Sequence, residues 1–138
     1  MRPRKAQAAF EYMVLIGIAL VILLGFVAFS YNWTISSQES LAISAAENSA
    51  AKIADAANLV YSQGYPAKTR VLIQIPYNIQ QISIQNTTIT FVVGSGGGTT
   101  DVFADSKAPM QGSIVAQPGN FFIAVQSFGD YVNVSRAT

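Results

Sequence analysis

The sequence predicts an α+β protein in which one long N-terminal α-helix precedes a small antiparallel β-sandwich-like head. Three observations carry this prediction. No proline occurs between Pro3 and Pro66, so a helix can run through the first half of the chain. Residues 13–29 of that half are continuously apolar. From Thr69 onward, apolar residues recur with a period close to two, which is the period of a β-strand.

The composition excludes several classes of function. Of the 138 residues, 51% are hydrophobic and 11% are charged, whereas an average soluble domain carries about 25% charged residues. The net charge of +1 provides no basic excess, so we expect no nucleic-acid partner. Histidine and cysteine are both absent, which removes disulfides, metal sites with nitrogen or sulfur ligands, and histidine acid–base catalysis. Metal sites with oxygen ligands and a Ser–Lys nucleophile remain compatible with the composition. Because the sequence shows no convergent set of titratable residues, we expect no catalytic residue, no cofactor and no metal, and predict that the protein is not an enzyme.

A basic cluster precedes the apolar run and predicts its orientation. The cluster consists of Arg2, Arg4 and Lys5. Together with residues 8–10, the run at 13–29 approaches the ~20 residues that cross a hydrocarbon core of ~30 Å. Because basic flanking residues remain in the cytoplasm, we expect the N-terminus inside and the rest of the chain outside.

Three interpretations of this segment compete. The first is a secretory signal peptide with a cleavage site at Ala28-Phe29-Ser30. The second is a simple single-span anchor. The third is a segment that is cut before its apolar run and keeps that run as a helix. Glu11 bears on the choice, because a carboxylate costs about 2.5–3.5 kcal/mol at the centre of a membrane helix and less near the interface. A signal peptide that is discarded has no use for such a group. Glu11 alone leaves the three interpretations open.

The first thirty residues resemble archaeal type IV pilin precursors, which carry a class III signal peptide. The positions that carry the resemblance are Lys5, Ala6, Gln7, Glu11 and Tyr12. In that family a prepilin peptidase removes the short basic leader on the cytoplasmic side, usually before Gln or Gly. The resemblance implies cleavage between Ala6 and Gln7, although Gly is commoner at the position of Ala6. Glu11 then becomes the fifth mature residue, where these pilins keep an acid.

The resemblance also implies a type IV pilin-like fold and a role as the structural subunit of an extracellular filament. The expected partners are other copies of the chain through helix–helix packing, the membrane before assembly, the prepilin peptidase and the pilus assembly machinery. Glu11, next to Tyr12, would pair with the N-terminal amine of Gln7 in another copy and set the register. The head would serve adhesion or surface interaction, with surface glycans as candidate ligands. Bacterial tight-adherence pilins share the Glu-Tyr pair, but as a family they are shorter and lack a β-rich head.

Each remaining segment has its own signal. A helix from residue 7 to 62 would be ~84 Å long at 1.5 Å per residue, and Gly64 with Pro66 predicts its end. We expect a cleaved leader at residues 1–6 and a membrane or filament-core half-helix at 7–30. An amphipathic half-helix that packs on the head is expected at 31–63, and the β-rich head at 64–138.

The amphipathic half shows one narrow apolar stripe with polar residues opposite. The stripe consists of Ala42, Ala46, Ser49, Ile53, Ala56 and Val60. The opposite side carries Glu47, Asn48, Asp55 and Asn58, and the flanks carry Leu41 with Leu59 and Ile43 with Tyr61. We expect the stripe to pack on the head and the flanks to remain for neighbouring copies.

The head is expected to contain five to seven short, mostly antiparallel strands. Turns are predicted at Asn86-Thr87, at 117–120 and at 128–130. The glycine-rich stretch 94–100 lacks the Gly-Lys of a nucleotide P-loop, and we interpret it as a flexible loop. The acids Asp101 and Asp105 are interpreted as solvated side chains, without a calcium ion.

Three sequons make N-glycosylation a candidate modification. They begin at Asn32, Asn86 and Asn133, and each is expected outside the membrane. Asn86 is the best placed because it lies at a predicted turn. Asn32, on the helix, is a candidate for burial between subunits. The function from another class that the sequence leaves open is a monomeric β-sandwich binding module, anchored by the apolar span or released after Ser30.

Overall fold

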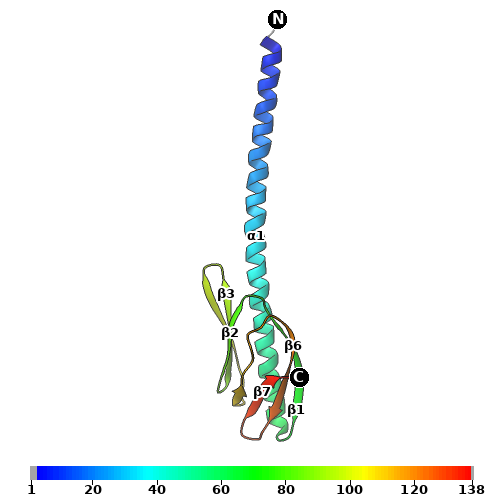
Figure 1. Ribbon diagram of the computed structural model, residues 1–138, viewed down its shortest axis with the longest axis vertical. Coiled ribbons are helices and arrows are strands. Elements are labelled where there is room, and N and C mark those ends of the chain that lie inside the picture. Colours follow the sequence, from blue (N-terminus) through cyan, green and yellow to red (C-terminus); the bar gives the residue numbers. More distant parts are fainter. Residues whose placement is uncertain (1–2, 138) are drawn as a thin grey trace. The chain divides into compact units, whose positions relative to one another are not determined.

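The computed structural model describes residues 3–137 and contains one helix and seven strands, which confirms the predicted α+β class (Figure 1). The helix α1 spans Pro3–Gln63. The chain divides into two compact units between Gln38 and Glu39. The first unit contains only the N-terminal part of α1, and the second contains the rest of α1 with all seven strands. Each unit is described by itself.

The end of α1 has the cap that the sequence predicts. Gly64 adopts a φ of 76°, a left-handed conformation that only glycine adopts readily. Its N–H donates to the carbonyl oxygens of Val60 at 3.0 Å and Tyr61 at 3.2 Å. These bonds use acceptors that the last turn of a helix leaves without an intrahelical partner, and the chain then turns into the first strand.

The seven strands form two sheets. The strands are β1 (Lys68–Ile75), β2 (Ile79–Gln85), β3 (Thr88–Ser95), β4 (Gly98–Asp105), β5 (Met110–Gly112), β6 (Gly119–Ser127) and β7 (Val132–Arg136). Sheet A has the strand order β1-β6-β7-β5, and sheet B has the order β2-β3-β4. Only the short β5–β7 pair is parallel among the described strands, so the expectation of five to seven mostly antiparallel strands is confirmed.

The hairpins of sheet B confirm one predicted turn and correct one prediction. Asn86, with a φ of 52°, lies in the tight turn between β2 and β3. The flexible loop expected at 94–100 is wrong, because Ser95 pairs with Gly98 and the strands β3 and β4 continue on either side. Only residues 96 and 97 form the turn. The glycines there permit a tight hairpin, and the β-branched threonines that follow suit a strand.

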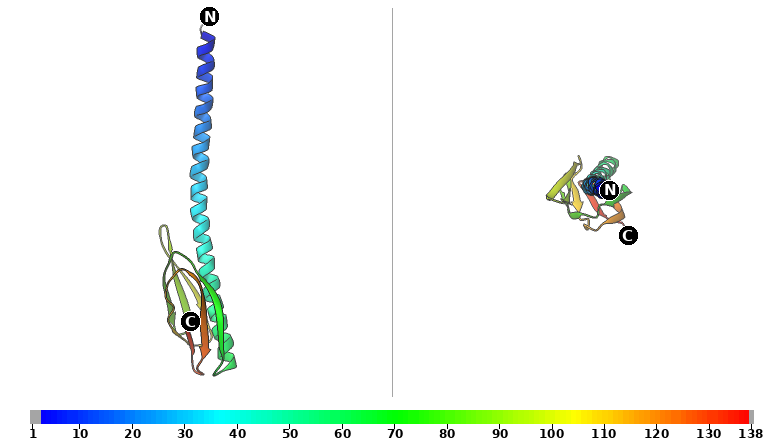
Figure 2. Two further views of the ribbon diagram at one scale, coloured as in Figure 1. Left: turned by 45° about the vertical axis from the view of Figure 1, so that its right-hand side comes forward. Right: turned by 90° about the horizontal axis from the view of Figure 1, so that it is seen from above.

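The C-terminal part of α1 lies beside the strands (Figure 2). Its buried residues share one hydrophobic core with the inner faces of both sheets. Its buried surface is wider than the predicted stripe, because Ala50, Ala54 and Ala57 are buried as well. Asn58, expected on the polar side, is half-buried. Two sheets cover the helix from different sides, so more than one narrow stripe is enclosed.

One hydroxyl joins α1 to the edge of sheet A. The Ser49 hydroxyl donates to the carbonyl oxygen of Gln74 at 2.7 Å and accepts from the N–H of the same residue at 3.1 Å. Gln74 belongs to β1, an outer strand of sheet A. Ser49 is 2% exposed. A buried hydroxyl therefore satisfies both backbone groups of a strand edge that faces the helix.

Two polar side chains of α1 join it to sheet B. The Asn58 Oδ1 atom accepts from the Ser106 hydroxyl at 2.9 Å and from the Lys107 N–H at 2.8 Å, just after β4 ends. The Glu39 carboxylate accepts from the Gly96 N–H at 2.7 Å, in the turn between β3 and β4. These bonds hold both ends of β4 along the helix.

Replacing Ser49 with alanine is expected to lower the free energy of unfolding of the head by ~1–3 kcal/mol, because both backbone groups of Gln74 lose their partner in a buried place. Ser44→Ala, an exposed position on the same helix, is the matched control and should change it by less than ~0.5 kcal/mol. Urea unfolding of the full chain in detergent, followed by circular dichroism, measures both. Equal stabilities would contradict a stabilising role for the Ser49 bonds.

Candidate assembly surface

The helical part of the first unit exposes large apolar side chains along most of its length. Those with more than half of their surface exposed are Phe10, Tyr12, Met13, Leu15, Ile16, Ile18, Leu20, Val21, Ile22, Leu23, Leu24, Phe26, Val27, Phe29, Tyr31 and Trp33. The helix is long and apolar enough to cross a membrane, and the most apolar stretch has no residue buried. A helix that is hydrophobic on all sides needs lipid or protein around it. This surface is the candidate functional site.

The residues of the predicted cleavage and register sites lie together at the start of α1. Ala6, Gln7, Glu11 and Tyr12 are all helical and exposed. The Gln7 side-chain amide donates to the Glu11 carboxylate at 3.4 Å, which is long for such a bond. Among residues 3–137 of the same chain, therefore, Glu11 has only a weak partner. Its proposed pairing with another copy stays a prediction.

Glu11 borders an apolar depression. Phe10, Val14 and Leu15 line this depression with Glu11, and its volume is about 340 Å³. An acid in such surroundings loses hydration when a neighbouring helix covers it, and a cation then offsets that loss. The mature N-terminal amine that the predicted cleavage creates is a cation of this kind.

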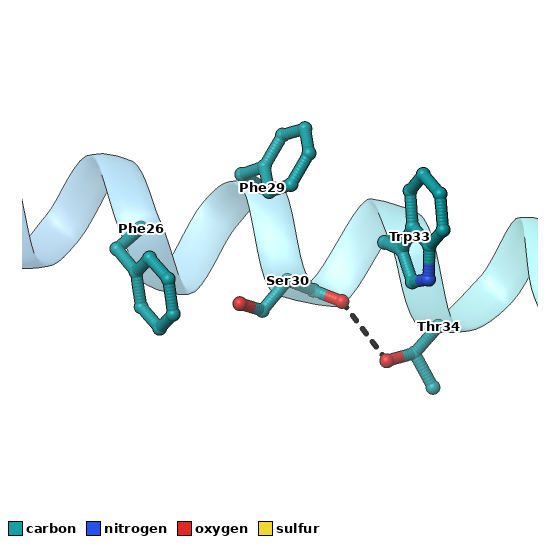
Figure 3. Close-up of a pocket in the computed structure, with 5 residues that line it drawn as sticks. All are labelled: Phe26, Phe29, Ser30, Trp33 and Thr34. Carbon is teal, nitrogen blue, oxygen red and sulfur yellow. Dashed lines mark hydrogen bonds between the residues drawn. The ribbon is translucent and has the colours of Figure 1, made fainter.

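A second depression lies further along the helix, and Figure 3 shows the five residues that line it. They are Phe26, Phe29, Ser30, Trp33 and Thr34, around about 500 Å³. The rings of Phe29 and Trp33 have centroids 6.2 Å apart, and the Thr34 hydroxyl donates to the Ser30 carbonyl oxygen at 2.9 Å. Sequence reasoning did not identify this site. Its signal is the spacing of three and four residues between the aromatic side chains, which places them on one face.

The two glycines of the apolar run have open space around them. A Cβ atom added at Gly17 or Gly25 would meet nothing within 4 Å. The isolated chain therefore gives no steric reason for glycine at these positions. Small residues on apolar helices allow the backbones of neighbouring helices to approach closely, and Ala19 fits the same description.

The three sequons occupy different settings. Asn32 is exposed within the helix α1 and not in a turn. Asn133 is half-buried on β7, between β6 and β5. Asn86 is exposed in a hairpin turn, which is the accessible setting that glycosylation requires. The structure thus leaves Asn86 as the best placed of the three.

The acids of β4 are arranged as exposed strand residues. Asp101 and Asp105 are both exposed, and the Asp105 carboxylate accepts from the Thr88 hydroxyl at 2.7 Å. Within residues 3–137, no group of three or more potential metal-binding side chains is found.

Comparisons of the chain with family models, with curated proteins and with solved structures returned no match. The architecture, a long apolar N-terminal helix followed by a small β-sheet head, is compatible with a type IV pilin-like fold and with membrane anchoring or a signal sequence.

Proposed function

We propose that the protein is a structural subunit of an extracellular type IV pilus-like filament of the archaeal kind. The observation that carries the proposal is the apolar surface of the first unit, which covers the helix on all sides and is exposed. The head, by contrast, buries its own core. A chain of this kind needs an apolar environment for its helix and water for its head, which a membrane provides first and a filament core provides later.

Assembly is the proposed mechanism, without a catalytic step. The precursor waits in the cytoplasmic membrane with its N-terminus inside, and a prepilin peptidase cuts between Ala6 and Gln7. Loss of the leader removes three basic residues and changes the formal side-chain charge from +1 to −2. Assembly machinery then moves the helix from lipid into contact with other copies. Because lipid and neighbouring helices are similarly apolar, close packing at small residues and the Glu11 pair supply the specificity.

The heads would form the outer surface of the fibre and serve adhesion or surface interaction. Sugars on Asn86 would add solubility to a surface with few charges. An intact mass equal to that of the bare mature polypeptide would contradict this modification and leave the filament proposal unchanged.

The mature N-terminus tests the function. Mass spectrometry of the protein purified from the cell surface is expected to find a chain that begins at Gln7. A chain that begins at Tyr31 would show that the apolar segment is a discarded signal peptide, and the secreted binding module would replace the filament. An intact Met1 would identify a simple membrane anchor.

A further inference from the structure

The proposed function requires contacts between copies, and two outer faces of the head are complementary in charge and apolar surface. Resting on that function, we propose that the outer face of sheet A in one copy packs on the outer face of sheet B in the next copy. The basic face is formed by Lys68, Arg70, Leu72 and Phe122 on sheet A. The acidic face is formed by Asp101, Phe103 and Asp105 on β4.

Both faces point away from the core. Inner residues of sheet A and sheet B belong to one hydrophobic core with α1, so the outer faces lie on different sides of the head. On sheet A, Leu72 pairs with Phe122 across β1 and β6, and they are 47% and 55% exposed. On sheet B, Phe103 is 67% exposed. Each face therefore has apolar side chains in contact with solvent at its centre.

The charges next to these apolar side chains have opposite signs and the same spacing. Arg70 lies two residues before Leu72 on β1, and Asp101 and Asp105 lie two residues on either side of Phe103 on β4. All three charged side chains are exposed. Packing Phe103 on Leu72 would therefore place an acid near Arg70 whichever way the strands run, because alternate residues on a strand are evenly spaced.

The two strands run in opposite directions along α1. β4 begins after the turn that contacts Glu39 and ends just before Ser106, which contacts Asn58. β1 begins after the end of α1 and reaches Ser49 through Gln74. β4 thus follows the direction of the helix and β1 opposes it.

The centres of the two faces also lie at about the same height. Two strand residues rise about as far as four helix residues, at about 3.3 Å and 1.5 Å per residue. Leu72 lies two residues before Gln74, which contacts Ser49. Phe103 lies three residues before Ser106, which contacts Asn58. Both side chains therefore lie near the turn of the helix that contains Ile53. Two heads in the same orientation, side by side, would present matching faces to each other.

A contact between two different faces does not close on itself as a two-fold dimer does. It continues from copy to copy and generates a ring or an open helical array, as a filament requires. The exposed ion pairs contribute ~0.2–1 kcal/mol each, so they orient the contact, and the apolar side chains supply most of the buried surface. High salt should weaken the charged part.

The absence of cysteine makes cross-linking a direct test, because engineered cysteines are the only thiols in the chain. In the full chain carrying both Leu72→Cys and Phe103→Cys, mild oxidation of assembled material is expected to give a ladder of covalent oligomers. The two positions lie on outer faces of different sheets, so a disulfide within one copy is excluded by its short reach. Each single variant should give no covalent ladder. The matched control is Leu72→Cys with Val115→Cys, because Val115 is 68% exposed and belongs to none of the described strands.

Charge reversal beside the two centres checks the same contact, with the same cross-link as the readout. K68E/R70E and D101K/D105K are each expected to lose most of the ladder in the double-cysteine background, and the chain with all four reversals should regain it. Filaments that form normally but give no ladder, or a ladder that survives each reversal, would overturn the contact and leave the filament function intact. A wild-type chain that never assembles would overturn the filament function itself.

Discussion

Replacing Glu11 with alanine is expected to suppress filament assembly. In the proposed assembly, the variant removes one partner of an ion pair that would become buried when helices pack, and would leave the Gln7 amine of the neighbouring copy without compensation. Breaking a buried pair in this way costs ~3–5 kcal/mol, and ~1.4 kcal/mol corresponds to a tenfold change in an equilibrium constant. Electron microscopy of material sheared from cells, with immunoblots of the membrane fraction, should find the subunit retained in the membrane.

Glu47→Ala is the matched control, because Glu47 is an exposed acid on the same helix. It should assemble as the wild type does. Glu11→Gln keeps the shape of the side chain and loses the charge, so its loss of assembly would separate charge from packing. Normal assembly of Glu11→Ala would contradict the pairing and leave the filament function standing.

Replacing Phe91 with alanine is expected to produce the largest loss of stability in the head. Phe91 lies on β3, is 0% exposed and belongs to the core shared by α1 and both sheets. Truncation of a buried phenylalanine costs ~3–5 kcal/mol, a large share of the ~5–15 kcal/mol that stabilises a typical protein. Urea unfolding of the full chain in detergent should show a much lower midpoint.

Phe103→Ala supplies the comparison within the same sheet, since Phe103 pairs with Thr90 on β3 and is 67% exposed. Its free energy of unfolding should stay within ~0.5 kcal/mol of the wild-type value, while the proposed contact between heads should be weakened. Equal losses in the two variants would contradict the position of the core.

Local signals predicted the parts of the fold that depend on neighbouring residues. The end of α1 follows from Gly64, which supplies the left-handed cap. The turn at Asn86 follows from a residue type that tolerates a positive φ. The glycine-rich stretch 94–100 was misinterpreted because the same glycines suit a flexible loop and a tight hairpin, and only pairing between β3 and β4 distinguishes the two.

Long-range contacts explain what the sequence could not reveal. The pairing of β1 with β6 joins residues about fifty positions apart. Nothing in the sequence of either strand identifies the strand with which it pairs. Asn58 was placed on the polar side of the helix because one stripe was assumed, whereas two sheets enclose a wider arc. Ser49 did carry a signal, as the one hydroxyl in an otherwise apolar stripe, but its partner Gln74 lies on another element.

The candidate assembly surface was more predictable than the head. Its apolar character follows directly from residues 13–29, since no tertiary contact is needed to expose a helix that is apolar on all sides. The depression between Phe26 and Trp33 required side-chain positions. The faces around Leu72 and Phe103 required knowledge of which strand residues point away from the core.

The central claim is that copies of this chain polymerise through their N-terminal helices. Cryo-electron microscopy of material sheared from the surface of cells that produce the full chain tests it most directly. We expect filaments with a core of packed helices, formed by the segment 7–30, and β-rich heads outside. Surface material that contains only single copies, with the apolar segment in lipid or cleaved off, would contradict the claim.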